Sequence, residues 1–252
     1  MEEQGIRINK FLSEAGVCSR READRQVAEG NVTVDGRRAE VGTRVLPGQS
    51  VCFCGREVAK EEEMILLALY KPVGIVCTAE KREKNNVIDY IGYPKRIYPI
   101  GRLDKDSEGL LLLTNNGDIV NKLMRAGNMH EKEYLVTVDK PITESFLRGM
   151  AGGVPLRELG VTTRKCRVER VGKREFRIIL TQGLNRQIRR MCEYFGYRVV
   201  KLVRTRIMNI ELGNLEKGKY RAVTTEEYGR LQKLLRGSSN ETVIPRQEDK
   251  KK

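Results

Sequence analysis

The 252-residue sequence has no tryptophan and a single histidine, His130. One histidine excludes a zinc motif of the HExxH type and leaves Ser-His-Asp chemistry only around that residue. The sequence also lacks a GxxxxGK[ST] phosphate loop and a GxGxxG dinucleotide fingerprint, so it predicts no nucleotide cofactor. If the protein is an enzyme, its reactive groups are expected among carboxylates, lysines, tyrosines and arginines.

Long apolar runs are absent too. No stretch of about 18 apolar residues occurs, which argues against a membrane span, and the N-terminal MEEQGIRINK has no apolar signal core. The six cysteines contain no CxxC pair and indicate neither a zinc site nor a disulfide framework. We therefore expect a cytoplasmic protein with free thiols, no metal and no cofactor.

Positive charge, in contrast, is abundant. The net charge is +14 and the pI is about 9.6, which suggests a polyanionic partner, most simply a nucleic acid. Residues 1–58 hold 9 Lys or Arg and 9 Asp or Glu, whereas residues 164–206 hold 14 and 3, a net charge of +11. Such a local excess repels itself, which favours a binding surface over a merely soluble basic protein.

Residues 1–58 are predicted to form a small α+β module. Two short helices are expected within residues 7–30, the second beginning with a capping box from Ser19 to Glu22. NVTVDGRRAEV then predicts two strands around an Asp35-Gly36 turn. Phosphates favour helix N-termini and arginine forks, and the second helix carries three candidate RNA-binding arginines near its start: Arg20, Arg21 and Arg25.

The rest of the chain divides by composition. Residues 59–64 are expected to be a linker, and residues 65–236 are rich in strand patterns that do not alternate regularly with helices. This pattern predicts an α+β domain with a mixed, largely antiparallel sheet. The polar tail, residues 237–252, ends in three lysines and is expected to be disordered and basic.

A helix is predicted over residues 186–195, capped by Asn185 and ended by Gly196. Its helical spacing places Arg189 at the edge of an apolar stripe, where a partly desolvated arginine would seek a carboxylate. Arg186 and Arg190 point away from the stripe and suit phosphate or solvent. The stripe consists of Ile188, Met191, Cys192 and Phe195.

Two further stretches carry candidate functional residues, a charged turn and a strand with a tyrosine. IGRLDKDSEGLLLLTNNGD, residues 100–118, sets a crowded charged turn against four leucines. In EKEYLVTVD, the alternation of a strand directs Tyr134 toward a mostly apolar interior, where its hydroxyl needs a partner. An ordinary core tyrosine is the alternative interpretation.

These motifs resemble known families. INKFLSEAGVCSRREADRQVAEGNVTVDG resembles the alpha-L RNA-binding module of ribosomal small-subunit protein four and of many RNA-modifying enzymes. YPIGRLDKDSEGLLLLTNNGD, with KPVGIVCT, KEYLVTV and GLNRQIRRMCEYFG, resembles the pseudouridine synthases of the RsuA branch. HEKEYLVTVDKPIT and RTRIMNIEL are most similar to enzymes of that branch that modify 23S rRNA.

The resemblance implies a role for each matching residue. Asp104 of GRLD matches the catalytic aspartate, Tyr134 matches a tyrosine that stacks on the target base, and Arg189 matches the basic residue that pairs with the aspartate. Arg102 matches a residue that fills the space left by a flipped base. Two more matches shape the pocket, Lys71 and Ile188. Asp106 and Asp118 have no such match and are expected to be turn or surface residues.

The expected function is therefore isomerisation of uridine to pseudouridine in RNA. The reaction involves neither redox change nor phosphate transfer, which agrees with the lack of cofactor and metal motifs. A monomer acting on a 23S rRNA stem-loop is expected, and the same chemistry on tRNA is an alternative. A non-catalytic rRNA-binding or assembly factor is a second alternative, and a carboxylate-dependent nuclease is a third, although nucleases of that kind usually need clustered acids and a metal.

Overall fold

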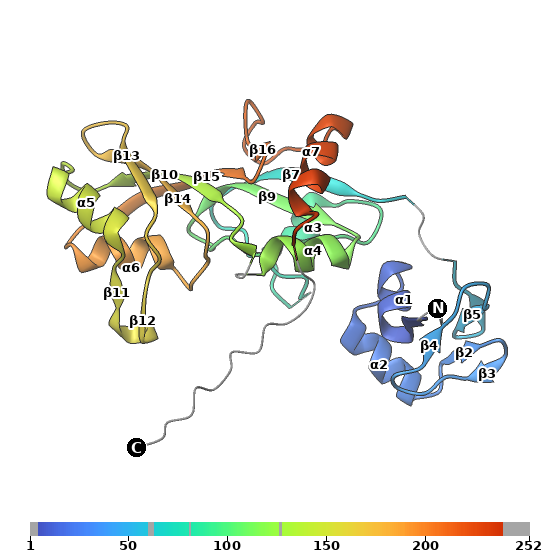
Figure 1. Ribbon diagram of the computed structural model, residues 1–252. Helices are drawn as coiled ribbons and strands as arrows, with labels where there is room; N and C mark the ends of the chain where they lie inside the picture. The colour runs from blue at the N-terminus through green and yellow to red at the C-terminus, as the bar shows by residue number, and fades with distance from the viewer. Residues whose placement is uncertain (1–4, 60–62, 81, 126–127, 239–252) are drawn as a thin grey trace, which may run out of the picture. The chain divides into compact units, whose positions relative to one another are not determined.

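The computed structural model of the chain describes residues 5–59, 63–80, 82–125 and 128–238 (Figure 1). The chain forms two compact units. The first comprises residues 1–65 with residues 92–98 and 114–117, and the second comprises the remainder. The middle of the predicted linker, residues 60–62, and nearly all of the predicted tail lie outside the described residues.

The N-terminal part begins with a helical pair followed by short strands. Ser19 caps the second helix as predicted, because its Oγ accepts a hydrogen bond of 3.2 Å from the backbone N–H of Glu22. The predicted turn also forms, with φ of 49° at Asp35 and 74° at Gly36. Its elements are β1 (Ile6–Arg7), α1 (Ile8–Glu14), α2 (Arg20–Ala28), β2 (Val32–Val34), β3 (Arg37–Arg38), β4 (Arg44–Val45), β5 (Val51–Phe53) and β6 (Arg56–Glu57).

The core of this part joins the helices to the strands. β3, β2, β5 and β6 are neighbours in one sheet, and β1 pairs with β4. Leu12 of α1 and Val27 of α2 pack into one buried apolar cluster with Val32 and Val51. The helices therefore bury their apolar stripe, and the three arginines of α2 named above remain exposed.

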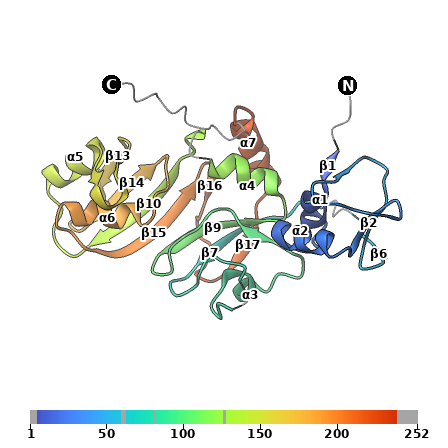
Figure 2. The ribbon, with the colours of Figure 1, turned by 90° about the horizontal axis from the view of Figure 1, so that it is seen from below.

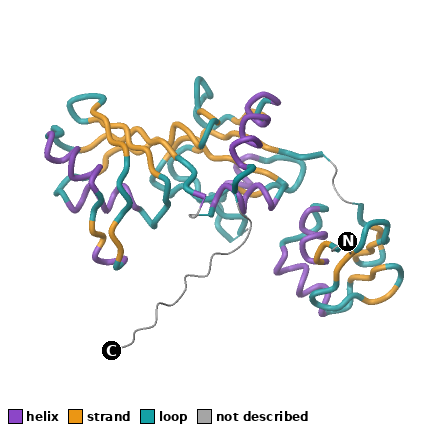
Figure 3. The backbone as a smooth tube through the Cα atoms, viewed as in Figure 1, coloured by secondary structure: helices purple, strands orange, loops and turns teal. Residues whose placement is uncertain are grey.

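The larger unit is built around one sheet with helices beside it (Figure 3). Its strands are β7 (Leu66–Lys71), β8 (Tyr98–Pro99), β9 (Glu108–Thr114), β10 (Lys132–Val138), β11 (Pro155–Leu156), β12 (Val161–Thr162), β13 (Arg167–Arg170), β14 (Glu175–Leu180), β15 (Val199–Ile207), β16 (Ile210–Glu211) and β17 (Tyr220–Ala222). Its helices are α3 (Val87–Ile91), α4 (Gly117–Met124), α5 (Glu144–Gly152), the 3-10 turn Arg157–Leu159, α6 (Gln187–Tyr194) and α7 (Thr225–Leu235).

The order in the sheet is β13-β14-β10-β15-β9-β7-β17, which Figure 2 shows from below. β10 is antiparallel to both β14 and β15, and β17 is antiparallel to β7. β15 and β9 run parallel, joined by the pairs Val203 with Glu108 and Arg204 with Gly109. The sheet is thus mixed and largely antiparallel, as predicted, and β15 lies between β10 and β9.

Gly109 makes the parallel pairing possible. Its φ is 110°, and a Cβ atom at this position would overlap the backbone of Arg204 on β15. The four leucines that follow, residues 110–113, are fully buried. The charged turn therefore precedes a rigid central strand.

A buried apolar cluster connects α5 and α6 to one face of the sheet (Figure 1). Met150 of α5 and Met191 of α6 pack there with Val136 of β10 and Ile178 of β14. The predicted capping box at the start of α7 is present as well. Within the described ranges, no helix combines the length and apolarity that a bilayer crossing requires.

Candidate active site

The loop between β8 and β9 presents the GRLD motif. Leu103 is buried, and its N–H donates to Sγ of Cys77 at 3.4 Å. The N–H of Ser107 donates to the carbonyl oxygen of Asp104 at 3.0 Å, which closes a turn directly after the motif. The Asp104 side chain is partly exposed and accepts no hydrogen bond from the described residues. Its carboxylate is therefore held by the loop alone and is open to a substrate.

Lys71 anchors the neighbouring turn from inside the protein. Its side chain is fully buried, and Nζ donates to the carbonyl oxygens of Pro72 at 2.8 Å and Ile75 at 2.9 Å. Burial lowers the pKa of Lys71. The same turn donates from the N–H of Gly74 to the carbonyl oxygen of Lys105, at 2.7 Å. Lys71 thus supports the GRLD loop from behind and does not line the cavity described below.

Helix α6 begins differently from the prediction. Asn185 does not cap it: the N-cap residue is Arg186, which has a left-handed backbone with φ of 50° and makes no capping bond with its side chain. Gln187 ties the preceding turn to the helix, because its Oε1 accepts from the N–H of Leu184 at 3.1 Å. The predicted end is correct, since Gly196 follows the helix with φ of 71°.

The predicted carboxylate partner of Arg189 is a different aspartate. Arg189 is 8% exposed, and its Nη2 donates to the carbonyl oxygen of Asp106 at 2.9 Å and to Oγ of Ser107 at 3.1 Å. Its Nε lies 3.4 Å from Oδ2 of Asp106. No contact with Asp104 within ion-pair distance is present between these described residues. The guanidinium binds the stretch just after Asp104, so it fixes the loop that carries the aspartate.

Asp106 is consequently more than the turn or surface residue predicted from sequence. Arg186 donates to it through two bonds, from Nη1 to Oδ1 at 3.1 Å and from Nη2 to Oδ2 at 3.0 Å. Burial alone would raise the pKa of Asp106, but the Arg186 hydrogen bonds and the charges of Arg189 and Arg186 outweigh it and hold the pKa below its usual value. Asp106 therefore forms ion pairs with both Arg186 and Arg189, next to the GRLD motif.

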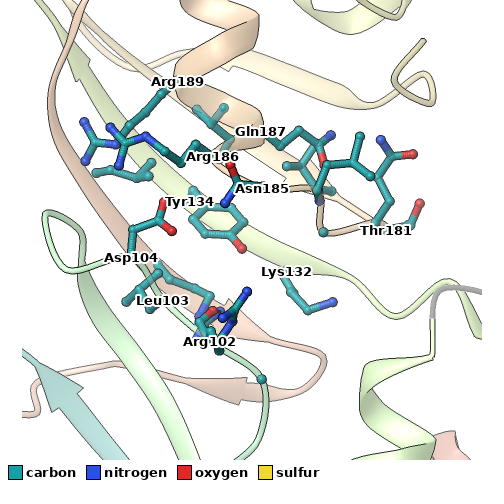
Figure 4. A pocket seen from close by; sticks show the side chains of 18 of the residues that line it. Arg102, Leu103, Asp104, Lys132, Tyr134, Thr181, Asn185, Arg186, Gln187 and Arg189 are labelled. Carbon is teal, nitrogen blue, oxygen red and sulfur yellow. Dashed lines mark hydrogen bonds between the residues drawn. The ribbon is translucent and has the colours of Figure 1, made fainter. Parts of the chain in front are cut away.

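A cavity of about 490 Å³ brings these parts together (Figure 4). It is bounded by the GRLD loop, β10, the end of β14, the start of α6 and β15. Six of the predicted site residues line it: Arg102, Asp104, Tyr134, Arg186, Ile188 and Arg189. Figure 4 shows the Tyr134 ring beside the Asp104 carboxylate.

The remaining predicted residues lie elsewhere. Arg190 donates to the carbonyl oxygen of Asn185 at 3.2 Å and forms an ion pair with Glu158. In α2, Arg25 is paired with Glu22 at 2.6 Å. The arginines of α2 belong to the other compact unit.

Among the lining residues that the sequence-based set lacks are two cations beside Tyr134. Lys132 lies two positions before Tyr134 on β10, and Arg204 is the strand partner of Tyr134 on β15. Burial, with the nearby charge of Arg204, lowers the pKa of Lys132 to about 8. The period of a strand could have placed Lys132 on the same face as Tyr134. No local pattern places Arg204 at the cavity, because its position depends on the pairing of β15 with β10, which are far apart in sequence.

The sequence is similar to RNA pseudouridine synthases over nearly its whole length. The RNA pseudouridylate synthase family matches residues 65–194, and the S4 domain matches residues 6–51. The dual-specificity RNA pseudouridine synthase RluF of Salmonella typhi is 56% identical over 241 residues, which cover 95% of this chain and 83% of that protein. RluF of Escherichia coli K12 is 55% identical over 252 residues, covering 99% and 86%.

More distant proteins are similar over nearly the same length. The ribosomal large subunit pseudouridine synthase B of Bacillus subtilis is 35% identical over 241 residues, which cover 93% of this chain and 98% of that protein. A crystal structure of a pseudouridylate synthase superposes with a TM-score of 0.65 and 28% identity, covering 91% of this chain and all of that one.

Proposed function

The chain belongs to the RNA pseudouridylate synthase family, and on that premise we propose that Asp104 is the carboxylate with which it isomerises uridine in RNA. The enzyme is an RNA pseudouridine synthase with an S4 domain near its N-terminus. Its reaction breaks the bond between N1 of uracil and C1′ of ribose, turns the base, and joins C5 to C1′.

The main support for Asp104 is its place in the cavity. Among the described residues that line the cavity, Asp104 is the only one that carries a carboxylate. A carboxylate can attack an electrophilic carbon or take a proton from the sugar, and either role requires an ionised, accessible group. Asp104 is partly exposed and free of hydrogen-bonding partners among the described residues, so it meets both requirements.

Tyr134 and Ile188 suit the base that the reaction acts on. An enzyme reaches a paired or stacked base by flipping it into a pocket, where aromatic and apolar side chains replace its lost stacking. The Tyr134 ring is packed against the apolar core while lining the cavity, and Ile188 is 4% exposed in the cavity wall. Arg102 is exposed at the rim and is assigned to the space that the flipped base leaves.

Arg189 acts in this scheme by fixing the loop of Asp104, and Arg186 and Arg190 flank the cavity for contact with the RNA backbone. Arg186 is half-exposed despite its bond to Asp106. Arg190 is tied to Glu158, so its phosphate contact requires an exchange of partners. The arginines of α2, in the S4 domain, provide a second backbone contact.

The proposed substrate is a stem-loop of 23S rRNA, with tRNA as the alternative. The similar RluF proteins are described as dual-specificity enzymes, and the Bacillus relative is a large-subunit rRNA enzyme by name. The strongly basic stretch of residues 164–206 suits a long, structured RNA backbone.

Replacement of the carboxylate tests the assignment. Asp104→Asn keeps the shape of the side chain and is expected to abolish pseudouridine formation while RNA affinity and folding stay close to wild type. Pseudouridine is detected as a chemical adduct after incubation with rRNA, and affinity is measured by filter binding. Glu211→Gln, an exposed carboxylate on β16 outside the cavity, is the matched control and should remain active. Continued isomerisation by Asp104→Asn would refute the assignment.

A further inference from the structure

The cavity has an excess of positive charge. Its described lining contains one carboxylate and six cationic side chains: Arg102, Arg125, Lys132, Arg186, Arg189 and Arg204. Arg186 and Arg189 are paired with Asp106, as described above. Neither Lys132 nor Arg204 forms an ion pair with a described residue. Lys132 and Arg204 are therefore among the cations of the cavity wall that lack a counter-charge from the described residues.

Arg204 is almost completely buried, with 3% exposure. Its Nε donates to the carbonyl oxygen of Leu110 at 2.7 Å, and its Nη1 donates to that of Arg102 at 3.3 Å. Its Nη2 is buried and has no hydrogen-bond partner among the described residues. An unpaired buried donor is energetically unfavourable, so this donor is expected to meet an acceptor during function.

Lys132 lies nearby on β10. Its ammonium group makes one long bond, 3.4 Å to the carbonyl oxygen of His130. The charge of Arg204 is among the causes of its lowered pKa, which places the two cations within each other's field. Figure 4 shows the Tyr134 ring between Asp104 and Lys132. A base stacked on Tyr134, with its sugar at Asp104, would direct its far edge toward Lys132.

We propose that Lys132 and Arg204 form an anion-binding pair that receives the carbonyl edge of the target uracil and stabilises the negative charge of the detached base. This inference rests on the proposed function of the same cavity. Lys132 touches the base directly, whereas Arg204 also holds the two ends of the GRLD loop through its carbonyl contacts.

The charge arises from the reaction itself. When the N1–C1′ bond breaks, its electron pair leaves with uracil and spreads over O2 and O4. The C5–C1′ bond then forms, the proton on C5 is lost, and N1 gains a proton, so atoms and electrons balance without an oxidant or reductant. If Asp104 instead adds to the base, the added electron pair also moves to a carbonyl oxygen. Donors at the carbonyl edge therefore assist both routes.

A backbone phosphate is the competing occupant. The structure favours the base edge because Arg204 is buried, lines the cavity wall and is the strand partner of Tyr134, the residue proposed to stack on the base. Phosphates of a bound RNA stay at the protein surface, where exposed Arg102 and half-exposed Arg186 are available. The flipped base is the part of the substrate that enters such a cavity.

The test measures single-turnover rates with saturating RNA, using a stem-loop that the wild-type protein modifies. Lys132→Met is expected to lower the rate constant about 100-fold, as for loss of one preorganised donor, with little change in Kd. Lys132→Arg should recover most of the rate because it restores a charged donor. Lys219→Met, an exposed lysine just before β17, outside the cavity and outside the basic stretch of residues 164–206, is the control and should behave as wild type.

Thio-substituted substrates identify the contact. Stem-loops with 2-thiouridine or 4-thiouridine at the target weaken one carbonyl acceptor each. One of them should slow the wild-type protein and leave Lys132→Met unaffected. An unchanged rate for Lys132→Met would overturn the inference while leaving the role of Asp104 intact. Weaker binding with a salt slope reduced by about 1 would assign Lys132 to a phosphate and would also overturn it. If the wild-type protein forms no pseudouridine in any RNA, the proposed function itself fails, and this inference fails with it.

Discussion

Removal of the Asp106 carboxylate is expected to loosen the loop beside the cavity without touching Asp104, the proposed reactive group. In the structure, Asp106 receives two hydrogen bonds from Arg186 and lies 3.4 Å from Nε of Arg189. Asp106→Ala leaves both arginines without that counter-charge. They are then attracted to the remaining carboxylate of the loop, Asp104, whose charge, after the larger effect of Asp106, already helps to raise the pKa of Arg186.

The magnitude follows from the exposure of each partner. The Asp106 side chain is 46% exposed and that of Arg186 is 42% exposed, so this surface pair contributes at most about 1 kcal/mol. The Arg189 side chain is only 9% exposed and its Nε has no hydrogen bond, so Asp106 supplies its counter-charge, and loss of a charged partner by a buried group costs about 1–3 kcal/mol. We therefore expect Asp106→Ala to lower the free energy of unfolding by about 2–3 kcal/mol.

The rate of pseudouridine formation by Asp106→Ala should fall even under conditions in which the variant remains fully folded. A displacement of about 1 Å at a reacting group can reduce a rate about 100-fold, and Asp106→Ala removes the two bonds by which Arg186 holds the loop that carries Asp104. Urea denaturation followed by circular dichroism gives the stability, and single-turnover pseudouridine formation gives the rate. Glu211→Ala removes an exposed carboxylate outside the cavity and serves as the control.

Dependence on pH provides an independent check. The pKa of Asp106 is lower in the folded protein than its ordinary value of 3.8, so its contribution is fully present above about pH 4 and is lost as pH falls through the folded pKa. The difference in unfolding free energy between wild type and Asp106→Ala should shrink in that range. If Asp106→Ala kept wild-type stability within about 0.5 kcal/mol and a wild-type rate, the reasoning about Arg189 would be wrong.

Two substitutions test the supporting framework. Lys71→Met removes the donor to the carbonyl oxygens of Pro72 and Ile75 and should lower the free energy of unfolding, measured by urea denaturation, by about 1–3 kcal/mol. The stability of the wild type should also rise with pH between the lowered folded pKa of Lys71 and 10.5, because the unfolded chain binds more protons in that range. The Lys71→Met variant should lack this rise. Gly109→Ala places a Cβ against the backbone of Arg204 at a φ of 110° and should cost about 3 kcal/mol or more, whereas Gly152→Ala, which meets open space, should not destabilise.

Local sequence signals predicted local structure well. Ser19 and Thr224 cap their helices, and the Asp35-Gly36 turn joins β2 to β3. These features depend on residues within a few positions of each other, so spacing alone identifies them. Asn185 failed as a cap because Arg186 adopts a left-handed backbone, which the preference for Asn at N-caps does not anticipate.

The site was harder to predict where partners are distant in sequence. The apolar stripe of α6 correctly predicted a desolvated Arg189 that needs an acceptor. It could not choose between Asp104 and Asp106, because two residues of one loop differ in direction only once the loop is folded. Arg204 was missed for the same reason: its neighbours Leu110 and Arg102 lie about a hundred residues earlier in the chain.

The position of β15 determines when the enzyme can become active during its synthesis. The strand with Tyr134 and the strand that follows Asp104 are not neighbours, and both must pair with β15, residues 199–207, to complete the order of the sheet. A ribosome delivers β15 only after both of these motifs have been made, because the strand lies about sixty residues beyond β10. A nascent chain that ends before β15 has every residue of the GRLD and KEYLV motifs but cannot bring them together. The two motifs can therefore meet only late in translation, after β15 has been released.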